Sequence, residues 1–87
     1  MDVVAAKHRK TLERVFETPT HASVRWPGVA ALIAALGGTL EEGAGSRVRI
    51  RLNGRRAVFH KPHPKPEMDK GAVVSLRVFL KEAGETP

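Results

Sequence analysis

The sequence predicts an α+β fold in which helices cover one face of a three-stranded antiparallel sheet. Apolar residues recur at helical spacing in three segments, residues 3–17, 27–36 and 70–83. Between residues 47 and 52 the pattern changes to strict alternation of Arg with Val, Ile or Leu, which is typical of a half-buried strand. The Asn53-Gly54 pair that follows favours a two-residue hairpin turn. With 87 residues, the chain has the length of one small domain.

The N-terminal part is predicted to hold two helices joined by a connector. The first helix is expected over residues 3–17, and residues 18–26, which contain Pro, Thr and Ser, form the connector. Pro27 suits the first position of the second helix, whose apolar stripe is filled in by alanines. We therefore expect this helix to be deeply buried and to end at Gly37-Gly38.

Three strands are expected next, over residues 39–42, 47–52 and 55–60, with a flexible turn at residues 43–45. Because a two-residue loop fixes the register, Arg47 should face His60 and Arg51 should face Arg56. One face of the hairpin then points to the core with Val48, Ile50, Leu52, Ala57 and Phe59. The other face is left open and carries Arg47, Arg49, Arg51, Arg56, Val58 and His60.

The C-terminal part is predicted to be a loop and a helix. Prolines alternate through residues 61–66 (KPHPKP), which excludes a central strand and indicates a rigid, extended, basic loop. Asp69 is a good N-cap for the last helix, and Gly84 ends it.

The positive charge is concentrated in one segment. The net charge is +6, yet residues 46–65 hold seven Lys and Arg and no Asp or Glu, so the remainder of the chain is slightly acidic. Such a patch favours a nucleic acid as partner first and an acidic protein second, and the alternative is a solvated basic face without a partner.

Several function classes are excluded by composition. Because the chain has no Cys, disulfides, thiolate nucleophiles and zinc–thiolate sites are impossible. Its longest apolar run, residues 29–36, is too short to span a bilayer, and the N-terminus has no secretory signal pattern. These features predict a cytoplasmic protein without a membrane partner.

Four short motifs occur in a recognisable order along the chain. They are Leu36-Gly37 at a helix end, Gly45-Ser46 before the second strand, Pro62-His63-Pro64 in the loop, and KGAVVSL at residues 70–76 leading to Ala83-Gly84. With this order of elements, the segment from Trp26 to Gly84 resembles the HicA toxin family, the mRNA-cleaving half of HicA–HicB toxin–antitoxin pairs.

This resemblance implies a double-stranded-RNA-binding-like α-β-β-β-α fold, mRNA cleavage that needs no metal or other cofactor, and inhibition by a HicB-like antitoxin in a higher-order complex. It divides the chain into residues 1–25, an N-terminal helix and connector, and residues 26–87, a HicA-like RNA-binding domain. The chain departs from the family twice. Arg47 occupies the position of the family's catalytic His, and the N-terminal helix is additional.

Metal-free RNA cleavage needs a base for the 2′-OH proton and cations for the charge that develops on phosphorus. His60 is the candidate base because the register places it across from Arg47, and Arg47 is the second catalytic candidate. The candidate RNA-binding residues are Ser46, Arg49, Arg51, Arg56, Lys61, His63 and Lys65. No metal site is predicted, since His60 and His63 have no Asp, Glu or Cys near them in the sequence. Trp26 precedes a buried helix and is expected to pack in the core rather than to stack on a base.

Three functions stay open at this point: an RNA-cleaving toxin, a non-catalytic RNA- or DNA-binding module, and a basic domain that binds only an acidic antitoxin. RNA cleavage in the presence of a chelator would support the first. Salt-dependent RNA affinity without cleavage would support the second. Binding of an antitoxin without RNA affinity would support the third.

Overall fold

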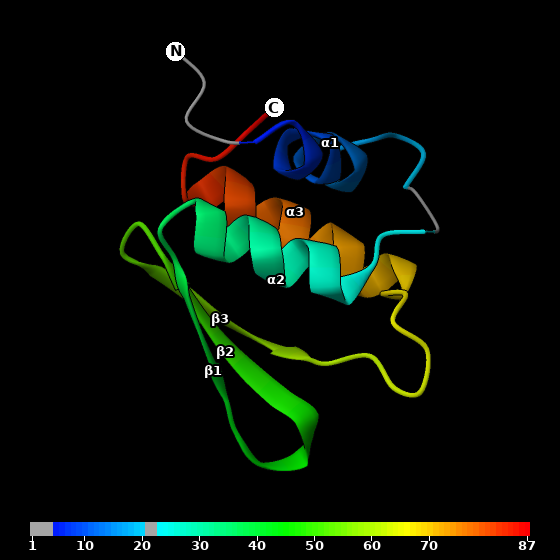
Figure 1. Cartoon of the computed structure of the whole chain (residues 1–87), viewed down its shortest axis with the longest axis vertical. Helices are drawn as coiled ribbons and strands as arrows, with labels where there is room; N and C mark the ends of the chain where they lie inside the picture. The colour runs from blue at the N-terminus through cyan, green and yellow to red at the C-terminus, as the bar shows by residue number, and fades with distance from the viewer. Residues whose placement is uncertain (1–4, 21–22) are drawn as a thin grey trace.

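The computed structural model describes residues 5–20 and 23–87. Within these residues the elements are α1 (Ala6–Val15), α2 (Trp26–Ala35), β1 (Thr39–Glu42), a short 3-10 turn η1 (Ala44–Ser46), β2 (Arg47–Leu52), β3 (Arg55–His60) and α3 (Lys70–Glu82). The strands form one antiparallel sheet in the order β1-β2-β3. Figure 1 shows α2 and α3 between the sheet and α1, so the helices all lie on one side of the sheet. The predicted α+β arrangement, with an α-β-β-β-α core like that of double-stranded-RNA-binding domains, is confirmed.

The predicted hairpin register is also confirmed. Arg47 pairs with His60, Arg49 with Val58 and Arg51 with Arg56. Asn53 and Gly54 have φ angles of 52° and 79°, the left-handed conformation that a tight two-residue turn between twisted strands requires. The hairpin therefore has one apolar face, on which Val48, Ile50, Leu52 and Phe59 are buried, and one exposed face of mainly cationic residues.

One core lies between the sheet and the helices. It is built from apolar side chains of each helix and of β2 and β3, among them Leu32, Ile33, Ile50, Leu76 and Leu80, which are fully buried. Phe59 of β3 and Phe79 of α3 meet edge to face with ring centroids 6.4 Å apart. Gly38 is needed at the entry to β1, because a Cβ there would lie 2.7 Å from the backbone oxygen of Arg51.

Two helix boundaries and one turn differ from the predictions. Helix α1 begins at Ala6 and ends at Val15, inside the predicted 3–17; residues 3 and 4 lie outside the described residues. Its C-terminal end lies two residues before the predicted one, because the ends of helices depend on weak preferences. Helix α2 begins one residue early, at Trp26, and residues 44–46 form a 3-10 turn with Gly45 at φ 67°, where the sequence predicts a flexible turn over residues 43–45.

The N-terminal segment is held to the rest of the fold by the guanidinium of Arg77 on α3. Its Nε donates to the backbone oxygen of Val15 at 2.9 Å, and its Nη2 donates to the backbone oxygen of Glu17 and to Oγ1 of Thr20, both at 3.1 Å. Leu12 and Val15 of α1 are buried in the same core as the sheet residues. The N-terminal helix thus shares its apolar core with the rest of the chain.

The last helix is capped as predicted. Oδ1 of Asp69 accepts a hydrogen bond from the backbone N–H of Ala72 at 2.8 Å. Gly84, at φ 83°, follows the C-terminal end. Among the helices that the structure describes, none is long and apolar enough to cross a membrane.

Candidate nucleic-acid interface

The open face of the hairpin is the most strongly charged surface that the sheet presents. Arg47, Arg49 and Arg51 from β2 and Arg56 and His60 from β3 are all exposed on it. Period-two alternation produces this surface: the Val, Ile and Leu residues between the arginines turn to the core, so each arginine must turn outward.

The backbone pairing brings the outward side chains of β2 and β3 close together. The N–H of Lys61 donates to the oxygen of Ser46 at 2.7 Å, so the next pair, Arg47 and His60, is of the non-hydrogen-bonded type. Alternation along the ladder makes Arg49·Val58 and Arg51·Arg56 the same type. In such pairs the Cα atoms are only about 4.5 Å apart and the side chains are nearest to each other. Arg47 and His60 are therefore direct neighbours on the open face.

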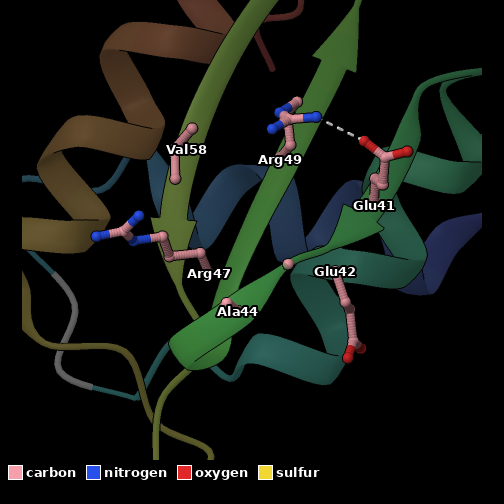
Figure 2. Close-up of a pocket in the computed structure, with 7 residues that line it drawn as sticks. Glu41, Glu42, Ala44, Arg47, Arg49 and Val58 are labelled. Carbon is pink, nitrogen blue, oxygen red and sulfur yellow. Dashed lines mark hydrogen bonds and ion pairs between the residues drawn. The ribbon is translucent and has the colours of Figure 1, made fainter.

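Strand β1 adds the Glu41 carboxylate to this cationic surface, whereas Glu42, which pairs with the buried Val48, is directed to the opposite face of the sheet. Glu41 pairs with Arg49 across the strands, and its Oε1 accepts a hydrogen bond from Nη1 of Arg49 at 2.8 Å (Figure 2). Oε2 of Glu42 lies 3.5 Å from Nζ of Lys61. A charge count over residues 46–65 finds no acidic residue and therefore does not reveal these contacts, which come from β1. The signal was present, because a strand at residues 39–42 next to β2 brings two carboxylates to the same sheet.

Two hollows flank the Arg47·His60 pair. The first, of about 290 Å³, is lined by Glu41, Glu42, Gly43, Ala44, Arg47, Arg49 and Val58 (Figure 2). The second, of about 380 Å³, is lined by His60, the loop residues Lys61 to Lys65, and Glu67, Met68, Asp69 and Ala72 at the start of α3. Arg47 thus borders one hollow and His60 the other, and both hollows open beside cations.

The proline-containing loop of residues 61–66 is fixed at both ends. At its start, Lys61 is bonded to Ser46 as described above. At its end, the backbone oxygen of Pro66 accepts from the N–H of Trp26 at 2.8 Å, and the Arg25 guanidinium lies 3.6 Å from the Glu67 carboxylate. These contacts place His63 beside His60, where both line the second hollow. Nothing in the sequence pattern indicated that the connector before α2 would hold this loop.

The chain was compared with models of protein families. The model for the HicA toxin of bacterial toxin–antitoxin systems matches residues 26–85. The chain belongs to the HicA toxin family. No curated protein and no solved structure matches it. As a HicA toxin, it has the role of the toxin in a toxin–antitoxin system, which implies a cognate antitoxin as partner.

The fold of this HicA toxin brings some of the predicted site residues together and separates others. Six of the predicted site residues lie at the end of the sheet away from the hairpin turn: Ser46, Arg47, His60, Lys61, His63 and Lys65. Arg51 and Arg56 pair next to the turn, four residues along the strands, which corresponds to about 13 Å. Trp26 is buried with only 5% of its surface exposed, so it packs in the core as expected. No group of His, Cys, Asp or Glu among the residues described has the arrangement of a metal site.

Proposed function

We propose that this HicA toxin binds mRNA across the open face of its sheet and cleaves it without a metal ion. His60 acts as the general base, and Arg47 stabilises the charge that develops on the phosphate. The observation that carries this proposal is the direct cross-strand pairing of Arg47 and His60 at the exposed end of the sheet. A basic group and a permanent cation stand side by side there, as the reaction requires.

The chemistry follows from the two side chains. Neutral imidazole takes the proton of a ribose 2′-OH, the oxygen attacks the adjacent phosphorus, and the bond from phosphorus to the 5′ oxygen breaks. The guanidinium of Arg47 offers two N–H groups in the planar geometry that suits a phosphate. His63 lines the same hollow as His60 and is the candidate donor of a proton to the leaving 5′ oxygen. The products are a 2′,3′-cyclic phosphate and a free 5′-OH.

The remaining cations define a path for the RNA backbone. Arg51 and Arg56 near the turn provide a second cationic position about 13 Å from the Arg47·His60 pair. Lys61 and Lys65 extend the positive surface beyond His60 along the loop. Phosphate contacts of this kind fix the position of the strand without reading its sequence.

A second candidate function is RNA binding without cleavage. It is favoured by Arg47 itself, because this residue stands where the resemblance to the family places the catalytic His. The scaffold and the cations would then bind RNA on the same face. In both cases we propose a HicB-like protein as the antitoxin that neutralises the toxin.

The test is cleavage of a labelled RNA by the purified protein in the presence of a metal chelator. We expect cleavage to a 2′,3′-cyclic phosphate, and a loss of about 10²-fold or more in rate for His60→Ala. His8→Ala on α1, which lies on the far side of α2 and α3 from the sheet, is the matched control. Unchanged cleavage by His60→Ala would refute His60 as the base. If the native chain binds RNA without cleaving it and Arg47→His gains cleavage, the binding module is the correct function.

A further inference from the structure

The outer edge of β3 presents backbone groups that have no hydrogen-bond partner in the described part of the chain. In a ladder of alternating pairs, residues of non-hydrogen-bonded pairs direct their N–H and C=O away from the neighbouring strand. On β3 these are Arg56, Val58 and His60, and β3 is the last strand of the described sheet. Within residues 5–20 and 23–87, no hydrogen bond outside the regular ladder involves the backbone of these three residues. Three donors and three acceptors therefore stand in a row, open to solvent.

The side chains along this edge are cationic or apolar. Arg55, Arg56, His60 and Lys61 are exposed, and 57% of the Val58 surface is accessible at the centre. Natural proteins usually protect an edge strand with proline, a bulge or a covering segment. Residues 55–60 contain no proline and pair in unbroken register. Positive charge is thus what protects this edge from pairing with other strands, and it disfavours only partners that are themselves cationic.

A second copy of the chain does not complement this edge. Antiparallel pairing of two β3 strands about Val58 would place Arg55 opposite Lys61, so like charges would face each other, and Arg56 opposite His60, a pair that offers no carboxylate. The β1 edge of another copy is acidic, but its Glu41 and Glu42 are already paired with Arg49 and Lys61 of their own chain. The charge on β3 instead fits an acidic strand from a different protein.

We propose that the edge of β3 is the docking site for an extended acidic segment of the antitoxin, which adds to the sheet as a fourth strand. This proposal rests on the antitoxin partner of the proposed function and not on RNA cleavage. Backbone bonds to Arg56, Val58 and His60 supply the affinity, and acidic side chains at every second position lie beside the cations of the open face. The added strand neutralises Arg56 and lies beside His60, so it also prevents RNA from reaching them.

The test uses a short synthetic peptide in which Glu alternates with Val, and a matched peptide in which Lys alternates with Val. Amide chemical shifts of the protein are recorded by NMR during titration. We expect the Glu peptide to shift the amides of Arg56, Val58 and His60 and the Lys peptide to leave them unchanged. Shifts confined to other elements, or equal effects of both peptides, would overturn the proposal.

A proline substitution separates strand addition from charge attraction. Val58→Pro removes an N–H that the ladder does not use, and proline is tolerated on edge strands at such positions. We expect Val58→Pro to weaken binding of the Glu peptide by at least about tenfold, which corresponds to the loss of a hydrogen bond of this kind. Val58→Thr retains the N–H and should bind the peptide as the native protein does. Equal binding by the two variants would mean that the peptide does not add as a strand.

Two further measurements keep the result interpretable. If Val58→Pro does not fold, N-methylation of the peptide at alternate residues removes the same hydrogen bonds from the ligand side. Binding that is unaffected whichever alternate set of peptide residues is methylated contradicts the proposal. Sedimentation of the native protein alone checks for a second copy on the edge. Concentration-dependent oligomers that Val58→Pro abolishes would overturn the argument from charge. Because no RNA is present, these outcomes are independent of whether the toxin cleaves RNA.

Discussion

The two edges of the sheet differ in charge. The edge strand β1 contributes acidic residues, whereas the edge strand β3 contributes basic ones. Strand β1 is four residues long and brings Glu41 and Glu42, which pair with Arg49 and Lys61. Strand β3 is six residues long and brings Arg55 and Arg56 but no acidic residue, and its ladder partners Arg47 and Arg51 have no acidic partner among the residues that the structure describes. The positive charge of residues 46–65 is therefore left without acidic partners mainly on the β3 side of the sheet. A charge count along the chain does not show this, because neutralisation depends on which strands are neighbours.

The largest expected effect comes from destabilising β2, the central strand, which pairs with both edge strands. Ile50 is fully buried beneath the sheet, so Ile50→Ala should lower the free energy of unfolding by about 2–5 kcal/mol. Its neighbour Arg51 points to solvent, and Arg51→Ala should change stability by less than about 0.5 kcal/mol. Urea denaturation followed by circular dichroism measures both. Equal losses would show that the two faces of β2 are not assigned as the register requires.

RNA affinity offers a direct comparison of the two sides. Among the residues that the structure describes, Arg56 has no carboxylate partner, whereas Arg49 is bonded to Glu41. We expect Arg56→Ala to reduce the salt slope of RNA binding by about 0.7 and the affinity at 0.1 M salt by about fivefold, the value of one phosphate contact to a single strand. Arg49→Ala should lose less, because its charge is already offset. Fluorescence anisotropy with a labelled single-stranded RNA over a range of salt concentrations measures the loss of affinity in each variant. A larger loss of affinity for Arg49→Ala than for Arg56→Ala would contradict this prediction.

Removing the carboxylate should make the β1 side resemble the β3 side. In Glu41→Gln the guanidinium of Arg49 is freed for phosphate, so RNA affinity should rise by up to about fivefold and the salt slope should become steeper. Thr39→Gln on the same strand and face adds the same side chain without removing a charge and serves as the control. The same titration detects the change. An affinity that stays the same would mean that Arg49 does not contact RNA.

The smallest effect concerns stability. The Glu41–Arg49 pair is 2.8 Å long, but the two side chains are 71% and 55% exposed. Exposed pairs of this kind contribute only about 0.2–1 kcal/mol, and salt screens them. A double-mutant cycle of Glu41→Gln and Arg49→Gln, measured by urea denaturation, should give a coupling energy in that range that declines at high salt. A coupling well above it would assign the β1 carboxylates a structural role in addition to neutralisation.

Much of the fold was predictable because its signals are local. Alternation at residues 47–52, the Asn53-Gly54 turn and the Asp69 cap each depend on a few adjacent residues, and the structure confirms all three. The hairpin register follows from the two-residue turn and places Arg47 across from His60. The start of α1 and the 3-10 turn at residues 44–46 were predicted less well, since the ends of helices and short turns depend on weak preferences.

The sequence by itself determined that one face of a hairpin is cationic, because side-chain direction in a strand alternates strictly and a two-residue turn leaves no freedom in the pairing. Only the tertiary structure decided which of those cations are neutralised, where the proline loop lies and which edge is open. Those outcomes depend on contacts between different segments of the chain, such as Glu41 of β1 with Arg49 of β2 and Trp26 with Pro66. These contacts are set by which segments become neighbours in the folded chain, and the preference of a segment for helix or strand does not specify its neighbours.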